Sequence, residues 1–213
     1  MALNTYLRHS VLILIAGLER AVTQRLIPAT GSLRPDAPGW KWEINTLTTE
    51  EMNAYAMPGG KIMVYSGLVE KLQLTDAELA AVIGHEISHA LREHTRERVS
   101  RAYAQQIALA GLAVVTGAGQ DALDLANQVA TVTFQLPHSR EQESEADMMG
   151  LELMARAGYD PESAVHLWQK MLAADKSNPP QFLSTHPSAP NRIGQLQAAI
   201  PRVMPLYRAA HQG

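Results

Sequence analysis

The chain has 213 residues, a formal net charge of −3 and no cysteine. This length suits one compact domain with a sizeable core, and we expect residues 1–213 to form a single domain. The net charge is slightly negative, so the composition gives no sign of a basic surface that would bind nucleic acid. The lack of cysteine excludes disulfides, cysteine nucleophiles and thiolate zinc sites.

The N-terminal part, residues 1–39, is predicted to hold one helix over 5–27 followed by a Pro- and Gly-rich connection. The helix contains an apolar run over 11–18, which is too short to cross a bilayer and which we expect to form a buried face. No small-residue cleavage site or lipid-accepting cysteine follows the run. An export signal is therefore not visible, and we expect any such signal to lie outside this sequence.

The next part, residues 40–70, is predicted to form a small sheet. Residues 40–47 alternate between apolar and polar and predict one strand, and residues 61–65 predict a second. The sequence Pro-Gly-Gly at 58–60 predicts a turn between them.

Residues 75–200 are predicted to form a helical catalytic core. Thr75 and Glu78 form a capping box, and the helix that they start keeps an apolar stripe as far as Leu91. Further helices are predicted over 104–134, over 139–157, from Pro161 onward, and from about 188 to 200. The helix over 139–157 starts with a second capping box, formed by Ser139 and Gln142. We expect the apolar stretch 107–115 to pack in the core, with contact at a membrane surface as the alternative. The predicted fold class is α+β and mainly α-helical.

Residues 85–89 read His-Glu-Ile-Ser-His, within the helix that Thr75 caps. Positions i and i+4 lie on one helix face, so His85 and His89 can both face one metal ion. Glu86, next to the first ligand, is placed to act as the general base toward the attacking water. This is the pattern of a zinc hydrolase helix.

A catalytic zinc site needs a third protein ligand, and the acidic residues at the start of the 139–157 helix are the best candidates. Glu143 and Asp147 are four residues apart, so one can bind the metal while the other orients a ligand histidine. Glu141 and Glu145 have the same spacing, and spacing alone leaves the choice among these carboxylates open.

Four ordered blocks of sequence, 53–68, 78–90, 139–150 and 184–193, resemble one family of membrane-associated zinc metallopeptidases. It is the gluzincin family of HtpX, the CAAX prenyl proteases and the periplasmic BepA-like enzymes. The chain is most similar to the soluble periplasmic branch and its mitochondrial inner-membrane relatives. The resemblance implies a zincin-type domain that holds one zinc ion per chain.

The resemblance also implies roles for particular residues. It selects Glu143 as the third ligand and Asp147 as its neighbour that orients a histidine, with Arg140 and Arg192 positioning carboxylates or the oxyanion. It places His186 near the metal, either as an oxyanion donor or as a fourth ligand that gates the site, and we favour the gate. His94, five residues beyond His89, is expected to turn away from the metal and to be structural.

A protease also needs a surface that holds an extended peptide. We expect residues 61–65 to be an exposed edge strand that pairs with substrate backbone and flanks the cleft. The substrate-binding candidates are therefore Gly59, Gly60, Lys61, Ile62 and Met63.

The function predicted from these features is zinc-dependent endopeptidase activity on polypeptides, in quality control of bacterial envelope proteins. The expected location is the periplasm, with a peripheral contact to the membrane or to outer-membrane assembly and no nucleic-acid partner. Two alternatives stay open: a chaperone or binding module that keeps zinc with little or no proteolysis, and a zinc hydrolase of non-peptide amides.

Overall fold

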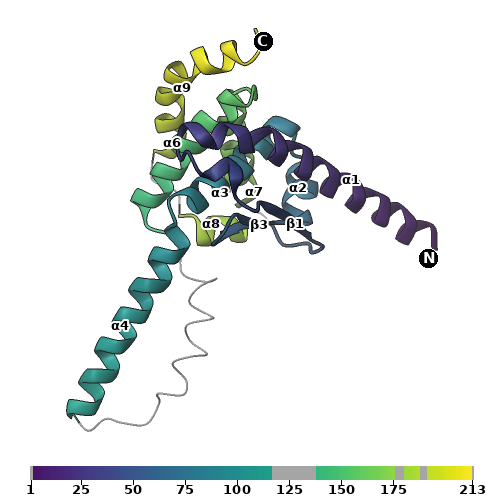
Figure 1. Cartoon of the computed structure of the whole chain (residues 1–213). Coiled ribbons are helices and arrows are strands. Elements are labelled where there is room, and N and C mark those ends of the chain that lie inside the picture. The colour runs from purple at the N-terminus through teal and green to yellow at the C-terminus, as the bar shows by residue number, and fades with distance from the viewer. Residues whose placement is uncertain (1, 117–137, 176–179, 188–190, 213) are drawn as a thin grey trace.

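The computed structural model describes residues 2–116, 138–175, 180–187 and 191–212 (Figure 1). These residues form a mainly helical fold with one three-stranded sheet. The α-helices are α1 (Ala2–Leu26), α2 (Ser66–Leu72), α3 (Asp76–Leu91), α4 (His94–Thr116), α6 (Arg140–Arg156), α7 (Glu162–Asp175), α8 (Gln181–Thr185) and α9 (Arg192–Ala209). The strands are β1 (Glu43–Leu47), β2 (Ala54–Met57) and β3 (Lys61–Tyr65), and short 3-10 helices cover Ile27–Ser32 and Ala37–Gly39.

Helix α3 is the centre of the molecule. Its side chains are buried almost continuously from Glu78 to Leu91, and it packs against α1, α6, α7 and β2. The predicted capping box is present, because Thr75 accepts from the Glu78 amide while the Glu78 carboxylate accepts from the Thr75 amide. A helix with a fixed start and neighbours on every side holds its side chains in defined positions, which a metal site requires.

Helices α3 and α6 cross where two glycines meet. A Cβ on Gly150 would lie 2.9 Å from the backbone nitrogen of His85 and 3.1 Å from the carbonyl carbon of Gly84. Such a close approach requires glycine. Helix α6 also starts as predicted, with a capping box between Ser139 and Gln142. The crossing brings the first turns of α6 alongside the C-terminal half of α3.

The sheet has the order β1-β3-β2. Strand β3 is confirmed, but the prediction that it forms an edge is wrong: it pairs parallel with β1 and antiparallel with β2. Strand β2 was not predicted, because Ala54–Met57 is short and contains no β-branched residue. Because β2 is present, Lys61–Tyr65 is the central strand of the sheet, and its backbone is paired on both sides.

Two helices extend from the body of the molecule (Figure 1). The run over 11–18 in α1 was expected to be buried, yet Ile13 and Leu14 are 61% and 71% exposed, and only Ile15 in the run is buried. In α4, Ile107 is 54% exposed, so the expectation that this residue packs in the core is wrong. The rest of the predicted helix beyond residue 116 lies outside the described residues, which contain no helix long and apolar enough to cross a membrane.

Candidate metal centre

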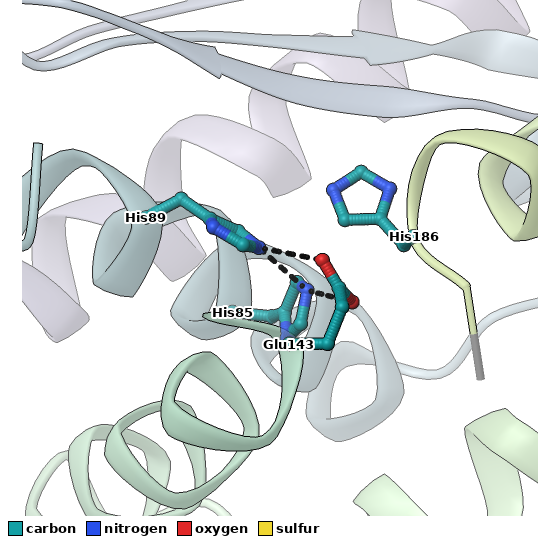
Figure 2. Close-up of side chains that lie close together, drawn as sticks. All are labelled: His85, His89, Glu143 and His186. Carbon is teal, nitrogen blue, oxygen red and sulfur yellow. Dashed lines mark hydrogen bonds and ion pairs between the residues drawn. The ribbon is translucent and has the colours of Figure 1, made fainter. Parts of the chain in front are cut away.

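Four side chains from three parts of the chain converge at one buried point, as Figure 2 shows. They are His85 and His89 of α3, Glu143 of α6 and His186, which directly follows α8. Their potential ligand atoms all lie within 4.8 Å of one another. The Nε2 atoms of His85 and His89 are 3.0 Å apart, and each lies within 3.4 Å of a Glu143 carboxylate oxygen. The three predicted ligands thus lie together, and the crossing of α3 and α6 places Glu143, rather than Glu145, beside the two histidines.

The ligands are oriented by buried ionic groups behind them. The Nδ1 atom of His85 lies 3.1 Å from Asp147, one helical turn after Glu143. Arg192, at the start of α9, donates to Asp147 at 2.5 Å and to Glu143 at 3.1 Å, and its guanidinium lies 3.4 Å from the centre of the Trp168 ring. Arg192 therefore holds both carboxylates of α6 in place, as the family resemblance implied.

The charges of this cluster are strongly coupled. Burial lowers the pKa of His85, but the carboxylates of Glu143 and Asp147 outweigh it and raise the pKa to about 9. Burial raises the pKa of Glu143, but the positive charges of His85 and Arg192 and the hydrogen bond with His85 outweigh it and lower the pKa below its ordinary value. The cluster therefore favours one extra positive charge beside Glu143, which a metal cation held by His85, His89 and Glu143 would supply.

Glu86 lies beside the ligands, with its carboxylate 3.3 Å from Nε2 of His186. It is completely buried, and neither oxygen has a hydrogen-bond partner among the described residues. Burial raises the pKa of Glu86 to about 7, although the neighbouring His85 lowers it. A carboxylate poised near neutrality can both accept and return a proton, as a general base requires.

His186 covers the other side of the cluster. Its ring stacks on Phe182 with centroids 4.0 Å apart, and its Nε2 atom lies 3.3 Å from Glu86. That nitrogen is buried without a hydrogen-bond partner among the described residues. Burial lowers the pKa of His186 well below its ordinary value, so the ring is neutral and carries a lone pair suited to a metal.

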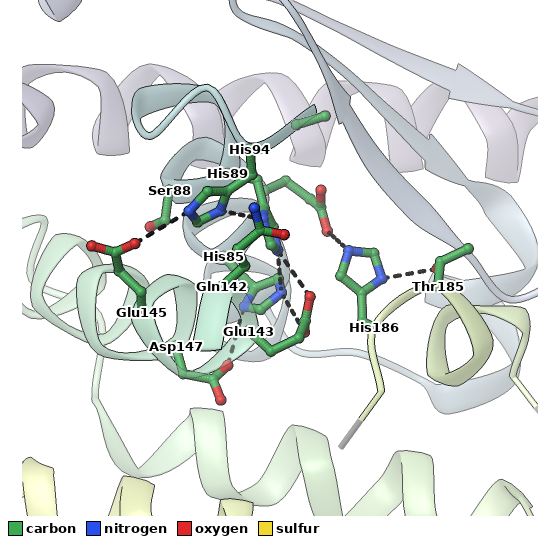
Figure 3. Close-up of polar contacts among 12 residues, drawn as sticks. His85, Ser88, His89, His94, Gln142, Glu143, Glu145, Asp147, Thr185 and His186 are labelled. Atoms are coloured by element: carbon green, nitrogen blue, oxygen red, sulfur yellow. Dashed lines mark hydrogen bonds and ion pairs between the residues drawn. The ribbon is translucent and has the colours of Figure 1, made fainter. Parts of the chain in front are cut away.

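A second chain of contacts supports His89 and gives His94, which was expected to be structural, a defined place behind that histidine. His94 is buried, and its Nδ1 atom lies 2.9 Å from Nδ1 of His89. On its other side, Nε2 of His94 lies 3.2 Å from Glu145, which Arg92 contacts at 2.6 Å (Figure 3). When Nε2 of His89 faces a metal, its Nδ1–H donates to His94, and His94 then donates to Glu145. Glu145, one of the competing ligand candidates, thus lies behind the site.

His138 is a buried residue of the site that the sequence analysis missed. It immediately precedes Ser139, the cap of α6, and its ring stacks on His89 with centroids 3.9 Å apart. Its backbone nitrogen donates to the carbonyl of Thr185, which ties the start of α6 to α8. The one sequence signal was a histidine next to a helix cap in the block that carries the ligand.

Other predicted site residues lie elsewhere. Arg140 is exposed at the start of α6, where it lines a surface hollow with Glu141, Ser144 and neighbouring residues, so a role at the carboxylates is wrong and Arg192 performs it. Gly59 and Gly60 have φ values of +82° and +78°, so the β2–β3 turn itself requires glycine. Lys61, Ile62 and Met63 lie on the central strand.

The donors present fit a zinc ion. Two imidazoles and one carboxylate are a common protein ligand set for catalytic zinc, and the unpartnered Nε2 of His186 and Oε1 of Glu143 are buried polar atoms that a cation would satisfy. His85 and His89 both have a hydrogen-bonding group at Nδ1, which leaves Nε2 free to bind.

Comparison with known proteins agrees with this geometry. Residues 19–200 match the model of peptidase family M48. The mitochondrial metalloendopeptidase OMA1 of Saccharomyces cerevisiae is 33% identical over 79% of this chain and 50% of its own length. The human OMA1 is 31% identical over 79% of this chain and 35% of its own length. The β-barrel assembly-enhancing protease of Escherichia coli is 30% identical over 75% of this chain and 34% of its own length. The chain spans half or less of the length of these relatives. A family match over this much of the chain, on top of the buried donor set, shows that the protein belongs to peptidase family M48.

Proposed function

We propose that the protein is a zinc-dependent endopeptidase. The observation that carries this proposal is the convergence of His85, His89 and Glu143 next to the buried carboxylate of Glu86. Zinc bound by these three ligands supplies a Lewis acid that activates water and polarises a carbonyl group. Family membership and the names of the relatives support the same activity.

The chain's own residues divide the remaining work. Glu86 takes a proton from the attacking water and delivers it to the leaving amine, which its pKa of about 7 favours. Asp147 and His94 hold the two ligand imidazoles with Nε2 free, and Arg192 holds Glu143 and Asp147 in position.

The outer edge of β2 replaces β3 as the proposed surface for the peptide backbone. The Tyr65 amide donates to the Asn53 carbonyl, so Tyr55 and Met57 also face β3, and the backbone groups of Ala54 and Ala56 point away from β3. There the Ala54 amide donates to the Asn53 side chain and the Ala56 carbonyl accepts from Thr95, so the Ala54 carbonyl and the Ala56 amide are the groups proposed to meet a substrate strand. This edge adjoins the site, because the Ala56 amide is close enough to the Glu86 carboxylate to lower the pKa of Glu86. A substrate strand on this edge would run past the catalytic carboxylate.

His186 is proposed to gate the site. Its neutral, unpartnered Nε2 lies within the donor set and beside Glu86, where it occupies the space that a substrate carbonyl would need. Opening then requires the segment after α8 to move. In the competing role, His186 donates to the oxyanion.

The biological setting is proposed from the relatives. The Escherichia coli protein is named for β-barrel assembly, which supports polypeptide quality control in the bacterial envelope, with a peripheral contact to outer-membrane assembly. The OMA1 relatives are mitochondrial proteins. Fractionation of cells that produce the full-length protein tests the periplasmic location, and recovery only in the cytosol contradicts it.

One observation favours the second candidate function, a zinc-retaining binding module. If His186 stays bound as a fourth donor, the site is closed in the manner of a structural zinc site. The substitution Glu86→Gln separates the two functions. The endopeptidase account predicts that this variant keeps one zinc per chain but loses casein cleavage, whereas the control Glu141→Gln, at an exposed residue of α6, keeps both. Wild-type protein that binds zinc but cleaves no unfolded polypeptide supports the binding module.

A further inference from the structure

His138 is a buried imidazole beside the metal cluster that is not one of its ligands. The residue is 6% exposed, and its Nδ1 atom has no hydrogen-bond partner among the described residues. It does not belong to the set of His85, His89, Glu143 and His186, but lies close to His89 and His94. Buried polar atoms of native proteins nearly always have a partner, so an orphaned one next to a catalytic centre points to a group that arrives with the substrate.

The ring of His138 borders the place where a substrate carbonyl is proposed to enter. It stacks on His89 with centroids 3.9 Å apart and on His186 with centroids 5.1 Å apart. The Nε2 atom of His186 lies within the donor set and 3.3 Å from the Glu86 carboxylate. A carbonyl group that takes this place, once His186 moves aside, therefore has the general base on one side and the His138 ring beside it.

His138 is suited to donate a hydrogen bond there. Burial lowers its pKa below the ordinary value, so the ring is neutral and carries one N–H group. A neutral imidazole can polarise a carbonyl group without giving up its proton. The His138 amide donates to the Thr185 carbonyl at 3.0 Å, and Ser139, the next residue, caps α6. With its backbone tied and its ring stacked, this donor is held in place before the reaction, which is what stabilisation of a transition state requires.

We propose that His138 is a catalytic residue that donates its ring N–H to the oxygen of the scissile carbonyl group as negative charge develops on that oxygen. The proton stays on His138, and Glu86 alone carries the proton from the attacking water to the leaving amine. His186 then acts as the gate and His138 as the oxyanion donor. The inference rests on the proposed endopeptidase function and adds a second group that acts on the substrate.

The test compares two substitutions of this imidazole, with a quenched fluorescent peptide that spans a mapped β-casein cleavage site as substrate. His138→Phe keeps a flat ring against His89 but has no donor, whereas His138→Gln keeps a donor. Loss of one oxyanion donor costs about 10²- to 10³-fold in kcat, so kcat and kcat/KM of His138→Phe should both fall by about 100-fold or more, and His138→Gln should recover at least about tenfold of that loss. A phosphinic peptide of the same sequence mimics the tetrahedral intermediate and should bind His138→Phe about 100-fold more weakly, while the zinc dissociation constant stays within about twofold.

Controls separate this role from support of the metal site. His166→Phe makes the same change at an exposed position of α7 and should alter none of these quantities. His138→Leu is a second variant without a donor and should behave as His138→Phe, and the thermal midpoint of each variant reports its folding. A kcat of His138→Phe within about threefold of the wild type, a higher KM at unchanged kcat, or a loss of cleavage matched by a loss of zinc overturns this inference alone. No cleavage by the zinc-loaded wild type overturns the endopeptidase proposal as well.

Discussion

The chain from His89 through His94 to Glu145 predicts that His94 controls zinc affinity without touching zinc. In the substitution His94→Ala, Nδ1 of His89 loses its partner at 2.9 Å. The His89 side chain is 0% exposed, so water cannot easily replace that partner. The imidazole is then free to rotate and to place its proton on the nitrogen that should bind the metal.

The expected size of the effect follows from two independent arguments. Loss of a group that orients a metal-bound histidine costs about 10- to 100-fold in metal affinity. A buried donor left without an acceptor costs about 1–3 kcal/mol, which is about 5- to 150-fold in an equilibrium constant. The two ranges together predict a zinc dissociation constant roughly 5- to 150-fold higher. Glu145→Gln should cost less than about threefold, because an amide oxygen still accepts from His94 and the Glu145 side chain is 37% exposed.

The assay is a competition titration of zinc against a fluorescent chelator at fixed pH and ionic strength. His94→Gln is the rescue variant, since its amide accepts from His89 and donates to Glu145, and Glu141→Gln is the control on the exposed surface of α6. The thermal midpoint of each metal-free variant shows any loss of folding stability separately. A zinc affinity of His94→Ala within twofold of the wild type would refute the reasoning.

Three other predictions follow from the structure. Gly150→Ala should destabilise the protein by about 1–3 kcal/mol in urea unfolding and weaken zinc binding, because its Cβ would push α6 away from His85. The control is Gly17→Ala, which adds a Cβ in open space on α1. Equal unfolding free energies of the two variants would contradict the close crossing of α3 and α6. His186→Ala should raise casein cleavage if His186 is a gate, and lost cleavage points instead to the oxyanion role. Glu19 is buried, which raises its pKa from 4.5 to about 7, so the folded state loses stability as pH rises from about 4.5 to 7. Glu19→Gln should therefore stabilise the protein by up to about 3 kcal/mol at pH 8 and leave it unchanged at pH 4, and an equal gain at both pH values would contradict this cause.

The parts of the fold that the sequence predicted are those with local signals. Helices α3 and α6 begin where their capping boxes indicated, because side chain and backbone three residues apart satisfy each other whatever surrounds them. Strand β2 has no such signal: Ala54–Met57 pairs as a strand because β3 and α3 pack around it. Missing that one strand was enough to misplace β3 at an edge.

In the metal site, too, local sequence signals predicted some features, whereas others depend on how the helices pack. The spacing of His85 and His89 is a property of one helix, whereas the choice of Glu143 over Glu145 depends on how α6 crosses α3. The contact between His94 and His89 was not predicted, because helical counting was carried past the end of α3. Glu93 adopts a left-handed φ of +54°, so the chain turns there, and His94, at the start of α4, faces back toward His89.

The most direct test of the central claim is an anomalous difference map collected at the zinc edge from crystals of the zinc-loaded protein. We predict one peak per chain, in contact with Nε2 of His85, Nε2 of His89 and the carboxylate of Glu143. The neighbouring set of His89, His94 and His138 is the competing location among the described residues. A peak bound by that set, or one that does not touch Glu143, would contradict the account.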